Sequence, residues 1–336
     1  MSDIATPGSR TLGYVLPIKL DDPAGEAELG SYLRWLDRQT ELIVVDGSAG
    51  PAFERHADSW AGINLIAPDP ALRTTNGKVW GVLTGLAFAT CEKVIVADDD
   101  VRYDAAGLER MNELLDGVEV VRPQNYFAPA PWHAQWDGAR SLLNRISGGD
   151  WPGTLGVRRS ALPRGYDGDC LFENLELVRT VVANGGREIV AGDVFVRRLP
   201  PSTVHFASQR VRQAYDEWAR PGRFALQLAL LPLAAYAATR NRALLVLLAT
   251  GSMALAEAGR RRSGARRYFS PAASLMAPMW LSERAICAWL ALGMRLVNGG
   301  AIYHGTTISR PATPLRELRA HAGNSARIPA REAGVL

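Results

Sequence analysis

Residues 12–125 alternate short, almost uninterrupted apolar runs with segments of helical character, and this alternation limits the possible folds more than any other feature. Five runs have the length and composition of strands, at 12–20, 41–48, 63–68, 93–100 and 117–124. Helices are expected between them, at 25–39, 78–90 and 105–115. Apolar strands separated by helices are typical of a mostly parallel sheet covered on both faces. The sequence therefore predicts an α/β fold with ligands bound outside the carboxyl ends of the strands.

Three consecutive aspartates end the fourth of these strands. Asp98, Asp99 and Asp100 follow an apolar run directly, and three like charges that repel one another have no packing reason to be there. Side chains alternate along an extended chain, so Asp98 and Asp100 face one ligand while Asp99 points away. Mg²⁺ and Mn²⁺ prefer oxygen ligands. A divalent metal site is therefore the functional interpretation, and an acidic surface turn is the alternative.

Other phosphate-binding and hydrolytic signatures are missing from the sequence. Lys78 follows Gly77, but position 72 is leucine, so no G-x-x-x-x-G-K loop exists. No G-x-G-x-x-G follows the first strand, and the segment DGSAG is not a G-x-S-x-G nucleophile elbow. The five histidines form no H-E-x-x-H. Serine nucleophile chemistry and zinc hydrolysis are therefore not indicated.

Composition excludes further classes of protein. The net charge is +4, and the arginines of the second half are not interleaved with aromatic residues, so no nucleic-acid partner is expected. Three cysteines, Cys91, Cys170 and Cys287, are far apart and form no C-x-x-C pair. This pattern favours a reducing compartment without a disulfide framework or a zinc cluster. Residues 1–10 lack an apolar segment, so no cleavable signal peptide is expected.

The composition becomes strongly apolar from residue 223. The segments 224–239 and 243–256 are apolar, and the basic run RRRSGARR at 260–267 follows them. A bilayer span needs roughly 20 apolar residues, so the two segments are short membrane helices, a re-entrant hairpin, or a pair of core helices. The basic flank favours the membrane, with the preceding residues on the cytoplasmic face. The stretch 271–297 contains charged residues and is expected to be an interfacial helix.

Five segments occur in an order that resembles the GT-A, family 2 glycosyltransferases, most closely their membrane-bound ceramide-glucosyltransferase-like branch. These segments are YVLPIK, ELIVVDGS, NGKVWGVLTGLAFATCEKVIVADDDVRYD, FENLELVRTVVANGG and SQRVRQAYDEW. The resemblance covers roughly residues 12–222 and implies a GT-A, Rossmann-like sheet domain that binds a nucleotide sugar, over 1–222. Membrane-associated helices are expected over 223–310 and a loosely ordered polar tail over 311–336.

The resemblance implies roles for several of these residues in holding the donor. Asp46 would contact the base or ribose of the nucleotide, and Lys78 would lie near the donor. Asp98 and Asp100 would be the D-x-D pair, with Mg²⁺ or Mn²⁺ bridging the diphosphate. Such a reaction needs the metal because the leaving group is a nucleoside diphosphate on which negative charge builds up.

The chain departs from the family at the expected catalytic base. The family takes its base from an E-D pair before a helix, whereas this chain has Glu173 followed by Asn174. An amide cannot act as a base, so either Glu173 serves, or Asp169 reaches in, or catalysis is impaired. Glu173 has a structural interpretation as well, as an acid favoured by the dipole at a helix N-terminus.

The family's Q-x-x-R-W motif corresponds to residues 209–213. Gln209 and Arg212 match, whereas Gln213 replaces the tryptophan. Arg212 would hold the donor diphosphate, since a guanidinium forks onto phosphate oxygens; the alternative is a surface arginine drawn to anionic lipid. Trp151 and Thr154 are candidates for the acceptor site, and a buried core tryptophan is the alternative for Trp151.

The predicted function is that of a membrane-associated, metal-dependent, inverting glycosyltransferase. It would move a sugar from a nucleotide-sugar donor to a lipid or lipid-linked acceptor. A nucleotidyl or phosphoryl transferase would also explain Asp98 and Asp100. A catalytically degenerate, membrane-tethered binding protein would explain Asn174 and Gln213.

Overall fold

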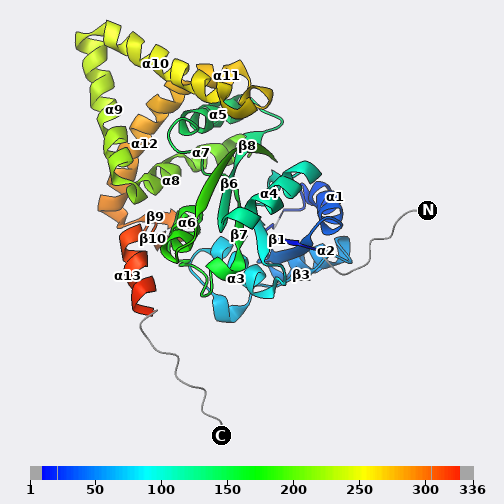
Figure 1. The fold of residues 1–336 in the computed structure, drawn as a ribbon. Coiled ribbons are helices and arrows are strands. Elements are labelled where there is room, and N and C mark those ends of the chain that lie inside the picture. The colour runs from blue at the N-terminus through cyan, green and yellow to red at the C-terminus, as the bar shows by residue number, and fades with distance from the viewer. Residues whose placement is uncertain (1–9, 21, 304, 326–336) are drawn as a thin grey trace.

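The computed structural model describes residues 10–20, 22–303 and 305–325. Within these residues one eight-stranded sheet has the order β3-β2-β1-β4-β7-β6-β8-β5 (Figure 1). Its strands are β1 (Leu12–Ile18), β2 (Glu41–Asp46), β3 (Leu65–Ile66), β4 (Lys93–Ala97), β5 (Val101–Arg102), β6 (Val120–Phe127), β7 (Thr154–Arg158) and β8 (Glu188–Arg198). The first part of the chain also forms α1 (Glu26–Asp37), α2 (Gly50–Ser59), α3 (Gly77–Phe88) and α4 (Ala105–Gly117).

The parallel half of the sheet agrees with the alternation in the sequence. β1 pairs in parallel with both β2 and β4, and β3 extends the sheet beyond β2. Tyr14, Leu33 and Ile95 are fully buried between the sheet and its helices. The carboxyl ends of β1, β2 and β4 therefore lie at one edge, and the acid triplet follows β4 at that edge. The predicted α/β fold with a mostly parallel sheet is confirmed.

Residues 126–222, whose sequence is less regular, complete the sheet. β7 inserts between β4 and β6 and is antiparallel to both, whereas β8 runs parallel to β6. The remaining elements of this part are α5 (Trp132–Asn144), α6 (Glu173–Ala183), α7 (Thr203–Ser208), α8 (Arg210–Tyr215) and the short 3₁₀ helix η3 (Asp216–Ala219). β8 ends at Arg198, which brings a basic residue to the edge that carries the acids.

The apolar C-terminal part consists of α9 (Pro221–Arg240), α10 (Arg242–Arg261), α11 (Pro271–Leu275) and α12 (Ala277–Asn298). Figure 1 shows α9 and α10 meeting at a corner well away from the sheet, while α12 runs back alongside α9 toward the small hairpin that follows it. Among the described residues, one helical stretch, Arg242–Arg267, is long and apolar enough to cross a bilayer by length and composition, which is weak evidence. The pair of short membrane helices expected from the sequence is thus reduced to one weak candidate.

Residues 271–297 were expected to form an interfacial helix, but α12, which covers most of them, is partly buried inside the protein. Trp280, Arg284, Ala288 and Ala291 are buried in it, and the helix packs against α5, α8 and α9. The charged residues that suggested an interfacial position instead meet protein groups: Trp136 donates a hydrogen bond to Glu283 at 2.7 Å. One face of α12 is therefore part of the protein core.

Part of the segment expected to be a loose polar tail is folded. A small hairpin of β9 (Ala301–Tyr303) and β10 (Thr306–Ile308) precedes α13 (Leu315–Ser325), which packs against α6. The Phe172 N–H donates to the Pro311 carbonyl at 2.7 Å, and the Thr313 N–H donates to Glu176 at 2.6 Å. These bonds tie the segment to the start of α6. Residues 326–336 lie outside the described part of the chain.

Candidate active site

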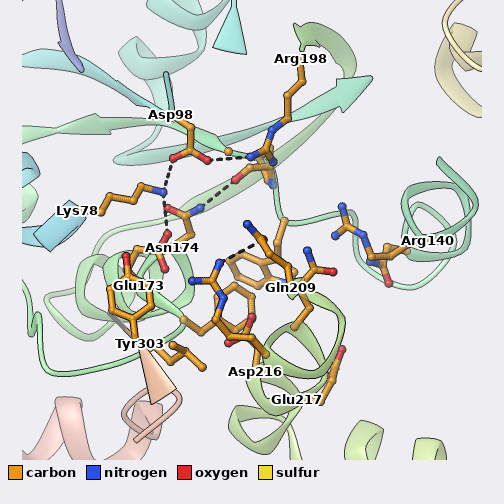
Figure 2. Close-up of a pocket in the computed structure, with 18 of the residues that line it drawn as sticks. Lys78, Asp98, Arg140, Glu173, Asn174, Arg198, Gln209, Asp216, Glu217 and Tyr303 are labelled. Carbon is orange, nitrogen blue, oxygen red and sulfur yellow. Dashed lines mark hydrogen bonds and ion pairs between the residues drawn. The ribbon is translucent and has the colours of Figure 1, made fainter. Parts of the chain in front are cut away.

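A cavity of about 450 Å³ opens at the carboxyl edge of the sheet, beside the acid triplet. Residues from both the sheet domain and the C-terminal helices form its wall, so the expected boundary at residue 222 runs through the site. The wall is highly charged: its acids are Asp98, Asp99, Asp100, Glu173, Asp216 and Glu217, and its bases are Lys78, Arg140, Arg198, Arg212, Arg220, Arg223 and Arg284. Figure 2 shows Lys78, Asp98 and Arg198 on one side of this cavity and Arg140 on the other.

The positive partners of the acid triplet are two side chains. Lys78 Nζ lies 2.5 Å from Asp98 Oδ1, and Arg198 Nη2 lies 3.2 Å from Asp98 Oδ2. Arg198 Nε also donates to the Asp100 carboxylate at 2.8 Å. Burial works to raise the pKa of Asp98, but Lys78 and Arg198 outweigh it and hold that pKa below the usual value. Burial and then its two acidic neighbours raise the pKa of Asp99 to about 6.

The two outer aspartates fit a divalent metal. Asp98 and Asp100 reach the same guanidinium, so their carboxylates are close enough to share one cation. Over the part of the chain that the structure describes, no group of three or more His, Cys, Asp or Glu side chains gathers as a complete metal cage. Two carboxylates are nevertheless the usual protein share of a Mg²⁺ site, since substrate phosphates supply further oxygens. A metal held here would need such a substrate.

Glu173 is the one of the two predicted base candidates whose carboxylate faces this cluster. It is the first residue of α6, and its Oε1 lies 2.7 Å from Lys78 Nζ. Asn174 lines the cavity too, but its side-chain amide donates to the Pro152 carbonyl at 3.0 Å. Asp169 lies outside the cavity wall, where it accepts hydrogen bonds from the backbone N–H and hydroxyl of Thr75 at 3.0 and 2.5 Å.

Gln209 and Arg212 both line the cavity, as the motif predicts. Arg212 donates to Gln209 Oε1 at 3.2 Å, and its guanidinium lies 5.3 Å from the centre of the Tyr303 ring. These contacts hold Arg212 at the wall instead of on a lipid-facing surface. Because Tyr303 belongs to β9, the C-terminal hairpin helps to position this arginine.

Asp216 is a site residue that the sequence analysis missed. It follows Arg212 by four residues, which places both on one side of the α8–η3 segment, and this spacing was the available signal. Its carboxylate lines the cavity, and in the described residues its Oδ1 has no hydrogen-bond partner. Burial raises the pKa of Asp216 to about 8, against the lowering effect of Arg212 and with a further rise from Glu173.

The raised pKa of Asp216 predicts how stability depends on pH. Between about pH 4 and pH 8 the unfolded chain loses this proton while the folded protein keeps it, so the free energy of unfolding falls as the pH rises. Asp216→Asn removes this contribution. The free energy of unfolding of the variant, relative to that of the wild type, should therefore be higher at pH 8 than at pH 5. We expect this difference to be about 2 kcal/mol, allowing for partial solvent access. Urea unfolding of both proteins at the two pH values measures this, and parallel pH profiles would contradict it.

The two acceptor-site candidates have different environments. Trp151 lines the cavity and packs edge-on against Phe172, with the ring centres 5.1 Å apart. Thr154 is 1% exposed, and its hydroxyl donates to the Val96 carbonyl at 2.9 Å. Thr154 therefore ties β7 to β4 in the core and does not form the cavity wall, a correction to its predicted role.

A second cavity of about 310 Å³ adjoins the first at the ends of β1 and β2 and shares Pro17, Lys78 and Tyr303 with it. Asp46 ends β2 nearby but is 1% exposed and lies outside the wall of either cavity. Its carboxylate is 2.7 Å from His56 Nδ1 and accepts the Ser48 N–H at 2.9 Å. The structure thus gives Asp46 a role in shaping the loop after β2, whereas direct contact with a nucleotide was predicted.

Of the comparisons with known proteins, only the one with solved structures gives matches. No protein-family model matches the chain, and no curated protein matches it. Glucosyl-3-phosphoglycerate synthase from Mycobacterium tuberculosis, in complex with Mn²⁺ and UDP-glucose, is 18% identical; the match covers 61% of this chain and 77% of that one, with a TM-score of 0.41. The complex of the same synthase with Mg²⁺ and UDP is 18% identical over 56% of this chain and 70% of that one, with a TM-score of 0.39.

A third structure, the same synthase with phosphoglyceric acid, is 19% identical, and the match covers 46% of this chain with a TM-score of 0.34. The chain spans 58% of the length of that structure. These are partial likenesses to a glucosyl synthase whose structures contain UDP or UDP-glucose and a divalent metal. The ceramide-glucosyltransferase-like branch stays a prediction.

Proposed function

We propose that this protein is a metal-dependent inverting glycosyltransferase that uses a nucleotide-sugar donor. The observation that carries the proposal is the meeting of Asp98, Asp100, Lys78 and Glu173 in one cavity at the carboxyl edge of the sheet. The adjoining second cavity is lined by residues that include Pro17, Thr74 and Trp80, and its size suits a nucleoside. The donor would therefore place its nucleoside there and its diphosphate beside the acids.

Five residues of the cavity have a chemical part in such a transfer. Asp98 and Asp100 would hold the metal ion, which when bound would neutralise charge on the departing nucleoside diphosphate. Arg212 reaches the phosphate oxygens with its planar guanidinium. The acceptor oxygen forms its bond to the anomeric carbon as the bond to the diphosphate breaks, and Glu173 takes the hydroxyl proton. Lys78 Nζ, 2.7 Å from Glu173 Oε1, keeps that carboxylate oriented.

Calorimetric titration of nucleoside-diphosphate sugars into the full-length protein, with and without Mn²⁺, tests donor binding. We expect one donor to bind in the presence of metal. Asp100→Ala should weaken that binding at least tenfold, because it removes one of the two carboxylates. Asp169→Asn is the matched control, since its carboxylate lies outside the cavity. Absence of binding by every donor under both conditions would remove the proposal.

We also propose that α9 and α10 rest on the cytoplasmic membrane surface, so that the active site faces a lipid-linked acceptor. Leu226, Tyr236 and Leu247 are 65%, 58% and 64% exposed on these helices. Arg240 and Arg242 stand at the turn between the helices, where they would meet anionic headgroups. An exposed apolar face of this kind, bordered by arginines, is typical of interfacial helices.

Flotation with phosphatidylcholine vesicles that contain phosphatidylglycerol tests the membrane proposal. We expect the wild type to float with the vesicles, and Leu247→Glu to lower the bound fraction several-fold because a charge enters the apolar face. Glu substitution of Leu275, exposed on α11, is the control outside α9 and α10. Equal flotation of wild type and Leu247→Glu would contradict docking through this face.

A further inference from the structure

The cavity has a second end that the transfer reaction described above does not use. Arg140 comes from α5, Arg220 and Arg223 flank the start of α9, and Trp280 and Arg284 come from α12. In the view of Figure 2, Arg140 lies across the cavity from Lys78 and Asp98. Four arginines thus line the same cavity as Lys78 and Asp98.

Most of these arginines have a carboxylate partner of their own. Arg220 and Arg223 share Glu217, at 2.7 and 3.4 Å. Arg140 pairs with Asp150 at 3.0 Å. Asp150 thus supplies one carboxylate to Arg140, and Glu217 supplies one carboxylate to Arg220 and Arg223 together.

Arg284 is different. Its ion pair is with Glu283, at 3.8 Å, and Glu283 also lies 3.6 Å from Arg210 and accepts the Trp136 indole N–H. Arg284 is only 2% exposed, and within the described residues its Nε and Nη1 have no hydrogen-bond partner. The buried Nε1 of Trp280, one turn away, is likewise unpartnered there. A buried and weakly paired guanidinium is costly to fold, and a bound anion would offset that cost.

We propose that this end of the cavity binds an anionic group of the acceptor, a phosphate or a carboxylate, with Arg284 as its main ligand. This inference rests on the proposed glycosyltransferase function and names the chemical class of its acceptor. A guanidinium fork and an indole N–H together supply donors that suit the oxygens of such a group. Within the described residues, the Nε atoms of Arg140 and Arg220 at the same wall also have no hydrogen-bond partner, although Arg140 Nε lies 4.0 Å from Asp137.

The position of this anion subsite agrees with the position of the base. The Arg220 guanidinium lies 5.5 Å from the centre of the Phe172 ring and 6.0 Å from that of Trp151. Phe172 directly precedes Glu173. An acceptor whose anionic group also reaches Arg220 would therefore lie beside these two rings, next to Glu173. The subsite would bind the phosphate of a soluble phosphate ester and that of a lipid in the same way.

Titration of inorganic phosphate into the full-length protein, followed by calorimetry and by the shift in thermal unfolding, tests the subsite without a donor. We expect saturable binding to the wild type, at least tenfold weaker binding to Arg284→Gln, and an intermediate affinity for Arg284→Lys. Arg260→Gln is the matched control, because Arg260 lies on α10 in a pair with Glu257. Phosphate affinities within twofold of each other in wild type and Arg284→Gln would overturn the proposal, as would no binding to the wild type.

Two further measurements separate a binding role from a structural one. Without phosphate, Arg284→Gln should unfold at a temperature no lower than the wild type, since a weakly paired buried charge is removed. A large drop would instead assign Arg284 to stability and would overturn the proposal. Lys78→Gln, at the opposite end of the cavity, should keep its phosphate affinity; a tenfold loss there would place the phosphate at the acid cluster and contradict the assignment.

The source of the anion is distinguished by two arms of the same assay. Glycerol 3-phosphate compared with glycerol reports a soluble acceptor, and phosphatidic acid in phosphatidylcholine vesicles reports a lipid phosphate. The ligand whose binding is weakened by Arg284→Gln identifies the source of the anion. Failure of all nucleotide sugars to bind, with phosphate binding intact, would remove the glycosyltransferase function and leave the anion site in place. Binding of a donor without any binding of phosphate would remove the anion site and leave the glycosyltransferase function in place.

Discussion

Glu173→Gln lowers the rate of sugar transfer by about 10²–10⁴-fold, the usual contribution of a general base. The amide keeps the size of the side chain but cannot take the proton of the acceptor hydroxyl. Glu173 faces the cavity, 2.7 Å from Lys78, which lies 2.5 Å from Asp98. The loss is therefore expected in kcat, with donor affinity changed only a few-fold. Steady-state kinetics and a donor titration on the same preparation measure both quantities.

Asp169→Asn is the control for this prediction, because Asp169 was the other base candidate in the sequence. Its carboxylate is engaged by Thr75 outside the cavity wall, so the rate should stay within a few-fold of wild type. A severe loss in Asp169→Asn together with a mild one in Glu173→Gln would exchange the two assignments. It would also require the loop after Thr75 to move on donor binding.

Gly259→Ala destabilises the protein by about 2 kcal/mol or more. A Cβ on Gly259 would lie 2.0 Å from the Leu142 carbonyl oxygen of α5, so α10 would have to move away from α5. The Gly259 carbonyl also accepts a hydrogen bond from Arg145 Nε at 3.2 Å, which the movement would stretch. Overpacking of this kind typically costs about 1–3 kcal/mol, more than alanine gains over glycine in a helix. Denaturant unfolding measures the change.

Gly251→Ala in the same helix is the matched control. A Cβ there would meet nothing within 4 Å, so the better helix propensity of alanine should stabilise the protein by up to about 1 kcal/mol. Opposite signs for the two substitutions are expected only if the C-terminal half of α10 packs on α5. Equal, stabilising effects would contradict that packing and would favour a helix α10 that separates from the sheet domain.

Much of the sheet and half of the site could be predicted from the sequence. Near-continuous apolar strands located β1, β2 and β4, and the charge change at Asp98 marked the functional edge. Lys78 and Glu173 were found through the order of the motifs. Asp46 and Thr154 were misplaced because burial cannot be seen in a motif: each stands at the end of a strand, yet its side chain hydrogen-bonds inward, to His56 and to Val96 respectively.

The rest of the site depends on contacts between distant parts of the chain. Arg198 reaches Asp98 across 100 residues, because β8 ends beside the acid triplet after β7 has inserted antiparallel into the sheet. Arg284 and Tyr303 line the cavity because α12 packs on α5 and α8. Local periodicity carries no information on such long-range packing. The C-terminal part therefore looked like a separate membrane region in the sequence, whereas it helps to build the site.

The most direct test of the account is a transfer assay with the full-length protein and Mn²⁺. It offers each nucleoside-diphosphate sugar together with a membrane lipid extract and with small phosphate-bearing alcohols, and mass spectrometry detects released nucleoside diphosphate and sugar-bearing product. We predict both in equal amounts for the wild type and neither for Glu173→Gln. Binding of a donor with no turnover toward any acceptor would contradict catalysis and indicate a binding protein. In a parallel incubation with nucleoside triphosphates in place of the sugar donors, release of pyrophosphate without any sugar transfer in the main assay would contradict it in favour of a nucleotidyltransferase.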